Sequence, residues 1–209
     1  MRCPYCLKPT YETLKECRHC RFSLGAADRM FGTVPRLNNT ITDLSQVLRV
    51  QQIAYLHEQI HTLRGLFPQV TFAMVTFELT PQAPFGAYLY WLFNRGGVCN
   101  QMERGSANRA ILCGVDTSGR RAGWCVGYGL EPFVGSRHLA ELLEPALPYF
   151  RKSEYYNGLR RSLDLIPGIL GQICDEIPSV YGVNVEEMKQ LEMAVNTNLP
   201  NMDLQVGEY

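Results

Sequence analysis

The sequence has no hydrophobic run long enough to cross a membrane. Its longest apolar stretch, FGAYLYWLF at residues 85–93, contains a glycine and is much shorter than the roughly 20 residues that a membrane-spanning helix needs. The first residues, MRCPYCLKPT, also lack the apolar segment of an export signal. We therefore expect a soluble protein that stays in the cytoplasm and has no transmembrane segment.

An excess of charge of one sign is also missing. The 20 Lys and Arg residues balance the 20 Asp and Glu residues, so the chain as a whole has no field that would attract nucleic acid or an anionic membrane. The charges are unevenly placed, because residues 1–36 carry seven basic and three acidic side chains, whereas residues 175–209 carry seven acids and one lysine. We expect a protein partner, bound through the basic N-terminal region or through the acidic tail, and we do not expect nucleic acid.

The sequence contains eight cysteines but no export signal. Because disulfides are rare in reducing compartments, we do not expect these cysteines to form a disulfide framework. Four of them form two C-x-x-C pairs ten residues apart, Cys3 with Cys6 and Cys17 with Cys20. Four thiolates complete the tetrahedral shell of Zn²⁺ and leave no open position for a catalytic water. We predict a structural zinc ribbon over residues 1–25 that folds on its metal; an iron site of the rubredoxin kind and a redox pair are the alternatives. The other four cysteines are expected to be buried thiols.

In the rest of the chain, segments whose apolar residues have the spacing of a helix alternate with segments typical of strands. Apolar residues at steps of three and four predict a helix from about Val50 to Pro68, followed by a buried strand in QVTFAMVTFEL and a helix in FGAYLYWLFNR. Two apolar runs around the turn Asp-Thr-Ser-Gly predict a β-hairpin. Ser136 is expected to cap the next helix, and a longer one is expected at 153–174, kinked or broken at Pro167 and Gly168.

Helices before, between and after the strands predict a three-layer α/β/α sandwich with a small central sheet, preceded by the ribbon. We divide the chain into the ribbon at 1–25, a linker at 26–40, the α/β/α domain at 41–174, and an acidic C-terminal helix and tail at 175–209. Asn184 and Glu187 have the spacing of a capping box in that last helix.

The string HEQIH at residues 57–61 matches the helical zinc motif of metallopeptidases, in which His57 and His61 would share one helix face. Such a site needs a third ligand and an open cleft. The other histidines are His19, inside the ribbon, and His138, and no downstream segment singles out a glutamate such as Glu78 or Glu141. We therefore favour helix histidines that are partly exposed or hydrogen-bonded, at the margin of the apolar face, and keep a zinc peptidase as a remote alternative.

One longer region is similar to a known family. VGYGLEPFVGSRHLAELLEPALPYFRKSEYYNGL, at residues 126–159, resembles the signature of the TPM domain family, which includes thylakoid acid phosphatases and photosystem-repair proteins. The matching elements are Val126 to Glu131, Pro148 to Arg151, and Tyr156 with Gly158. Upstream, Asp43-Leu44-Ser45 with Val47-Leu48 and the hairpin NRAILCGVDTSGRR also resemble the family, so that the similarity covers roughly residues 40–174.

The resemblance implies an α/β/α sandwich with an acidic pocket, in some members a site for a divalent cation, and sometimes weak phosphatase activity. Two of the family's expected carboxylates are absent, because its Asp-Asn-Gly reads Ala107-Asn108-Arg109 here and its Leu-Thr-Asp reads Phe133-Val134-Gly135. The remaining candidates for a catalytic or Ca²⁺/Mg²⁺ site are Asp43, Asp116 and Glu131, and those for binding a ligand are Asn108, Arg120 and Arg121. Asp116 has an alternative role as the turn residue of the hairpin.

Three functions follow from these observations. We favour a TPM-like domain with a zinc ribbon that acts as a binding or assembly module with little or no catalysis, because a cation site needs several oxygen ligands and this chain has lost two. The alternatives are a phosphatase assisted by a divalent metal and the zinc peptidase. A phosphate-binding P-loop is not among them, since VGYGLE lacks the required Lys-Ser/Thr.

Overall fold

The computed structural model describes residues 2–11, 13–98 and 106–180. The chain divides into two compact units, Met1–Ile169 and Leu170–Tyr209. The first unit contains the ribbon, the sheet and every site discussed below. Of the second unit only the end of one helix is described, so the predicted capping box at Asn184 and Glu187 lies outside the described residues. No helix in the described ranges is long and apolar enough to cross a membrane.

The centre of the first unit is a four-stranded sheet. Its strands are β1 (Ile41–Asp43), β2 (Thr71–Phe77), β3 (Ala110–Asp116) and β4 (Arg121–Val126), and they lie in this order across the sheet. The first three are parallel, and β4 returns antiparallel to β3. The predicted hairpin is therefore confirmed. Residues of β2 and β3 are almost all buried because both strands lie inside the sheet and have helices on both faces.

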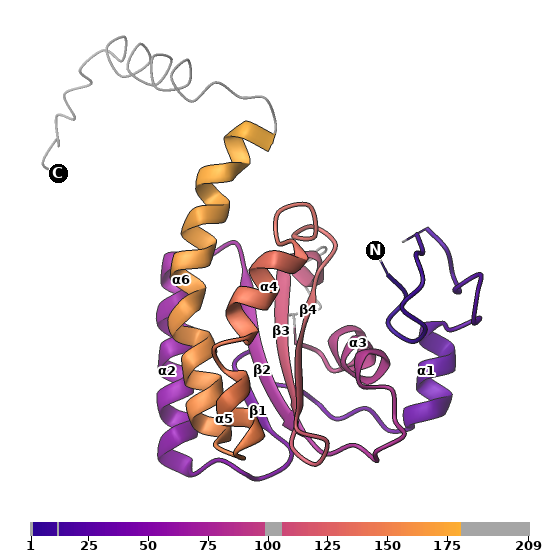
Figure 1. Ribbon diagram of the computed structural model, residues 1–209, viewed down its shortest axis with the longest axis horizontal. Coiled ribbons are helices and arrows are strands. Elements are labelled where there is room, and N and C mark those ends of the chain that lie inside the picture. The colour runs from indigo at the N-terminus through magenta and orange to yellow at the C-terminus, as the bar shows by residue number, and fades with distance from the viewer. Residues whose placement is uncertain (1, 12, 99–105, 181–209) are drawn as a thin grey trace, which may run out of the picture. The chain divides into compact units, whose positions relative to one another are not determined.

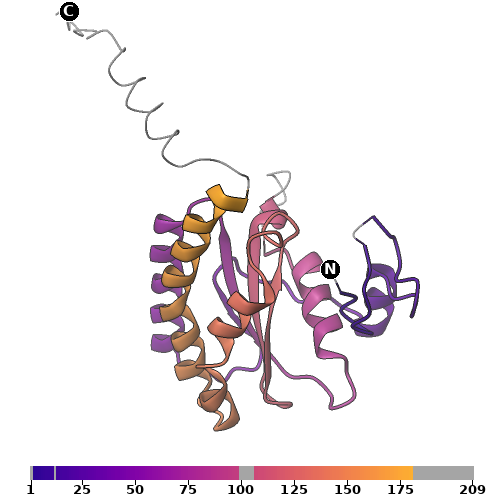
Figure 2. The same ribbon diagram turned by 45° about the horizontal axis from the view of Figure 1, so that its top comes forward.

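Helices cover both faces of the sheet, as Figures 1 and 2 show. One face carries α1 (Leu24–Phe31) and α3 (Phe85–Arg95). The other carries α2 (Val50–Leu66), α4 (Ser136–Leu143), α5 (Leu147–Arg151) and the first part of α6 (Tyr155–Val180). The predicted three-layer α/β/α sandwich is confirmed. The predicted face of α2 is largely buried, because Leu56, Ile60 and Leu63 are in the core while Ile53 is only half-buried.

Three local predictions were wrong. A helix, α1, spans the end of the predicted ribbon and the start of the supposed linker, and Ser23 caps it by accepting a hydrogen bond from the Ala26 N–H at 3.2 Å. Ser136 is the first residue of α4 and does not cap it; Gly135 holds the cap position, where its N–H donates to Nδ1 of the buried His138 at 3.3 Å. The long helix α6 passes through Pro167 and Gly168 without a break and continues to Val180.

A tertiary contact explains why α1 was missed. The indole N–H of the fully buried Trp91 on α3 donates to the Asp28 carboxylate at 2.9 Å, and Arg95 forms an ion pair with the same carboxylate at 2.7 Å. These contacts hold α1 against α3, and no local period in the sequence reveals them.

Among the remaining cysteines, Cys113 is buried, Cys125 is half-buried and Cys174 is exposed, so the expectation of burial fails for Cys174. Cys99 lies outside the described residues.

Candidate metal centre and binding groove

The four N-terminal cysteines converge. All four Sγ atoms lie within 4.8 Å of one another, with 3.7 Å between those of Cys3 and Cys20 and 3.8 Å between those of Cys6 and Cys17. A tetrahedron of sulfurs at the usual Zn–S distance of about 2.3 Å has edges of about 3.8 Å, whereas a disulfide requires about 2.05 Å. The four cysteines could therefore bind a metal ion such as zinc.

Two similar backbone turns aim the sulfurs. In the first, the Cys3 N–H donates to the Lys8 carbonyl and the Leu7 N–H donates to the Cys3 carbonyl, both at 2.9 Å. The second repeats this pattern at 2.8 Å with Cys17 and the two residues after Cys20. The residue after each pair, Leu7 or Arg21, adopts a positive φ of 61° or 57°. Each turn thus places two thiols on the same side of the chain.

The environment of the thiols separates their pKa values. Backbone N–H groups of Cys20 and His19 donate toward Cys17 and lower its pKa to about 7. Burial raises the pKa of Cys20 to about 12 and also raises that of Cys3. Metal binding must therefore release protons from the less acidic thiols, and the affinity of such a site falls as the pH is lowered.

The ribbon shares its hydrophobic core with the sheet domain. Cys3, Cys17 and Phe22 are buried in the same cluster as the apolar residues of α3 and β2. The Phe22 ring stacks on Tyr5, with a centroid distance of 5.5 Å, and its edge meets Tyr90 of α3 at 6.2 Å. The ribbon is therefore packed on α3 as part of the first unit.

Asp116, at the end of β3, has no exposed surface, and its carboxylate is engaged on both oxygens. It accepts hydrogen bonds from the N–H groups of Leu79 and Gly119 and from the Ser118 hydroxyl, and it pairs with Arg121 at 2.7 Å. Burial alone would raise the pKa of Asp116, but these donors outweigh it and lower the pKa. The carboxylate holds the hairpin turn and the loop after β2 together.

The carboxylate of Asp43, at the end of β1, also accepts hydrogen bonds from nearby groups of the protein. It accepts the N–H groups of Val47 and Leu48, at 3.2 and 2.8 Å, and the hydroxyl of Thr76 on β2. It thus shapes the loop that leads into α2. The two candidate arginines are also engaged: Arg121 with Asp116, and Arg120 with the carbonyl of Arg151 at 3.4 Å.

The third candidate carboxylate, Glu131, lies at the other end of the sheet. The strand register pairs Asp116 with Arg121 and Ile111 with Val126, and Glu131 follows Val126 within one turn. Five residue steps along β3 amount to about 17 Å. Asp43 and Asp116 therefore lie at one end of the sheet, while Glu131 and Asn108, whose backbone carbonyl accepts from Gly129, lie at the opposite end.

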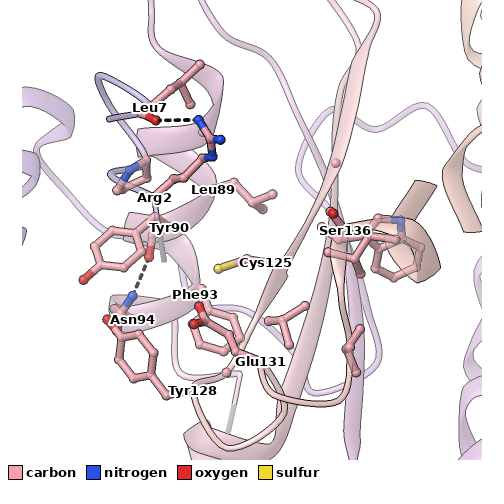
Figure 3. Close-up of a pocket in the computed structure, with 18 of the residues that line it drawn as sticks. Arg2, Leu7, Leu89, Tyr90, Phe93, Asn94, Cys125, Tyr128, Glu131 and Ser136 are labelled. Carbon is pink, nitrogen blue, oxygen red and sulfur yellow. Dashed lines mark hydrogen bonds between the residues drawn. The ribbon is translucent and has the colours of Figure 1, made fainter. Parts of the chain in front are cut away.

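A cavity of about 770 Å³, which we call the β4 groove, lies along β4. One wall is α3, through Phe85, Leu89, Tyr90 and Phe93, and Pro4 and Leu7 of the ribbon extend that wall; the other wall is the segment 134–139 at the start of α4. Figure 3 shows the sulfur of Cys125 pointing from β4 toward α3, with Glu131 at the cavity. This size is typical of ligand-binding pockets.

Comparison with known proteins agrees with this fold. Residues 41–168 match the TPM domain family. The chain belongs to the TPM domain family. Its fold is similar to the N-terminal domain of a protein from P. gingivalis solved by NMR, with a TM-score of 0.54 and 22% identity over 73% of this chain and 94% of that one. The N-terminal domain of a Corynebacterium glutamicum protein gives a TM-score of 0.45 at 12% identity, covering 59% and 74% of the two chains. None of the curated proteins compared matches the chain.

Some of the positions where this TPM domain departs from the expected motifs line the β4 groove. Two of the six candidates, Asn108 and Glu131, line it, as do Val134 and Gly135 from the stretch where the resemblance leads us to expect Leu-Thr-Asp. Among the described residues that line the groove, Glu131 is the only carboxylate. Sequence reasoning missed the groove itself, which is lined by three glycines at positions 86, 123 and 127.

The HEQIH string lies on α2 of the TPM domain. His57 and His61 are both exposed there. Within the described residues, the four ribbon cysteines are the only group of three or more His, Cys, Asp or Glu side chains close enough to share a metal ion. Glu141, one of the glutamates considered as a third ligand, pairs with Arg137 at 3.1 Å. Nothing in the described part of the domain completes the motif.

Proposed function

We propose that this TPM domain, with its ribbon, acts as a binding or assembly module with little or no catalysis. The observation that carries the proposal is the position of the three candidate carboxylates. The carboxylates of Asp43 and Asp116 are each occupied by hydrogen bonds from neighbouring protein groups, and Glu131 lies at the opposite end of the sheet. Divalent-metal hydrolysis of phosphoesters needs several oxygen ligands around one point, and these three groups are too far apart to provide them.

The ribbon supports the same proposal as a zinc site formed by Cys3, Cys6, Cys17 and Cys20. The sulfur separations fit the edges of a zinc tetrahedron, and four reduced thiols suit a cytoplasmic protein. A closed shell of four thiolates gives structure and no reactive water. Elemental analysis of the purified protein should find about one zinc per chain. Retention of that zinc after Cys17→Ser substitution would contradict the assignment.

The competing function, a phosphatase assisted by Mg²⁺ or Ca²⁺, predicts a different result. We expect the protein to hydrolyse p-nitrophenyl phosphate no faster than a blank with the same metal. Metal-dependent turnover that is lost in Glu131→Gln and kept in Glu144→Gln, a control at an exposed position after α4, would overturn the proposal. Circular dichroism of both variants shows whether the fold is unchanged.

A further inference from the structure

Strand β4 is an edge of the sheet, and its free backbone groups can be assigned from the register. The Gly127 N–H donates to the Ala110 carbonyl at 2.8 Å, and the register places these two residues directly opposite each other. In an antiparallel pair, hydrogen-bonded and non-hydrogen-bonded positions alternate. Arg121, Gly123 and Cys125 therefore bond to β3, and three residues direct their N–H and C=O groups to the open edge: Ala122, Trp124 and Val126.

These outward groups have no partner in the described part of the chain. No backbone hydrogen bond joins Ala122, Trp124 or Val126 to another described segment, and β4 pairs only with β3 there. Proteins usually protect an exposed edge with lysine, proline or a bulge. Between Arg121 and Gly127 the sequence AGWCV contains neither lysine nor proline, and its register with β3 runs without a bulge.

The β4 groove follows this open edge. Residues 123–127 line it, with α3 on one side and the start of α4 on the other, as Figure 3 shows for Tyr90 and Ser136. A strand added to β4 would direct alternate side chains to these two sides. On the α3 side they would meet an apolar wall that includes the buried Leu89 and the half-buried Phe93. The groove thus combines unpaired backbone groups with apolar walls for side chains.

The position of a charged residue, Glu131, indicates how a bound strand would be oriented in the groove. Glu131 is exposed at the Val126 end of the groove, and its carboxylate has no hydrogen bond or ion pair within the described residues. Its charge reaches the groove: burial raises the pKa of Cys125 to about 12, and the negative charge of Glu131 adds to that shift. An antiparallel strand would begin beside Val126, so a basic residue near its amino end would meet Glu131.

We propose that an extended segment of a partner protein adds to β4 as an antiparallel fifth strand, with apolar side chains in the β4 groove and a Lys or Arg beside Glu131. The inference rests on the proposed function, because it names the partner chemistry of a binding module. Main-chain hydrogen bonds would supply affinity, and the groove would supply selectivity. The helical walls on both sides of the edge favour a single strand over a second copy of this chain.

The test uses the unmodified full chain and the peptide acetyl-Lys-Val-Thr-Val-Thr-Leu-amide, with affinity measured by calorimetry. Two N-methylated forms carry methyl groups on alternate backbone nitrogens. Only one set of peptide N–H groups faces β4 in an added strand, so we expect one form to bind at least about tenfold more weakly and the other to bind within a few-fold of the parent. Equal binding of both forms overturns strand addition.

Protein variants give a second readout. Ala122→Pro removes an outward N–H and leaves the bonds to β3, so it should weaken peptide binding about tenfold, while the control Ala122→Ser should not. Glu131→Gln should weaken binding of the lysine peptide severalfold and leave a norleucine analogue unchanged. In ¹⁵N spectra, the amides of Ala122, Trp124 and Val126 should shift and become protected from exchange when the peptide is added.

Three outcomes would contradict the inference. The first is peptide-induced shifts that avoid β4. The second is binding that ignores Ala122→Pro. The third is protection of the β4 amides without peptide in a concentration-dependent dimer, which would assign the edge to a second copy. The phosphatase assay is independent of all three: metal-dependent turnover would defeat the binding-module proposal while the N-methyl comparison still decides strand addition.

Discussion

Replacing Asp116 should cost stability before it costs any activity. The Asp116→Ala substitution removes the buried carboxylate, so the N–H groups of Leu79 and Gly119 lose their acceptor. Arg121, whose side chain is 32% exposed, loses its ion-pair partner. Removing one partner of a buried ion pair typically costs about 3–5 kcal/mol. A domain of this size is stable by about 5–15 kcal/mol, so the variant should lose a large fraction of its free energy of unfolding.

Two milder substitutions at the same site should cause smaller losses of stability. Asp116→Asn keeps the shape of the side chain and some acceptor capacity, so we expect a loss of about 1–3 kcal/mol. Ser118→Ala removes one donor to the same carboxylate, and also a 2.6 Å hydrogen bond to the Leu79 carbonyl, and should cost about 1 kcal/mol. Urea denaturation followed by circular dichroism measures all three variants against the wild type.

The pH dependence has a definite sign. The pKa of Asp116 is lower in the folded state than the value of about 3.9 expected in the unfolded chain. Its contribution to stability is therefore complete above that unfolded value and is lost as the pH falls through the lower folded value. The difference in unfolding free energy between the wild type and Asp116→Asn should shrink below about pH 4. An Asp116→Ala variant as stable as the wild type that has lost metal-dependent phosphatase activity would refute this reasoning and make Asp116 a ligand.

Further predictions concern the ribbon, its contact with α3, and the HEQIH helix. Cys17→Ser should lose its zinc and unfold the ribbon, and zinc should leave the wild type as the pH is lowered, both measurable with a chromogenic chelator. Gly86→Ala should lower the melting temperature, because the added Cβ would lie 2.8 Å from the Pro4 carbonyl, with a cost of about 1–3 kcal/mol; Gly65→Ala, a helix position with open space around it, should instead raise stability by about 0.5–1 kcal/mol. His57→Ala should leave the zinc content unchanged, and a loss of about half the zinc would revive the peptidase.

Elements with a strong local period were predictable. The α2 helix, β2 and the β3–β4 hairpin all follow from apolar spacing and from the turn residues around Asp116. The short elements were not, because α1 depends on the contact of Asp28 with Trp91, and β1 has only three residues and depends on its pairing with β2. Local patterns carry no information about such partners.

For the candidate sites too, some features could be predicted from local sequence patterns and others could not. The four ribbon cysteines could be grouped from spacing alone, since each C-x-x-C turn aims two sulfurs at one point. The family motifs identified Asp43, Asp116 and Glu131 as candidates, but motif order does not show which end of a sheet a residue occupies. Only the register between β3 and β4 separates Glu131 from Asp116.

The position of the ribbon ties metal binding to the β4 groove. Pro4 and Leu7 belong to the first C-x-x-C turn, and both line the groove beside α3. Leu7 is 65% exposed and has a positive φ, a conformation that costs an L-residue roughly 1 kcal/mol and persists only where surrounding contacts impose it. The closed turn around Cys3 and Cys6 provides those contacts. Without metal the turn has less to hold it, so one end of the groove wall should loosen, and peptide affinity at β4 should fall together with the zinc content.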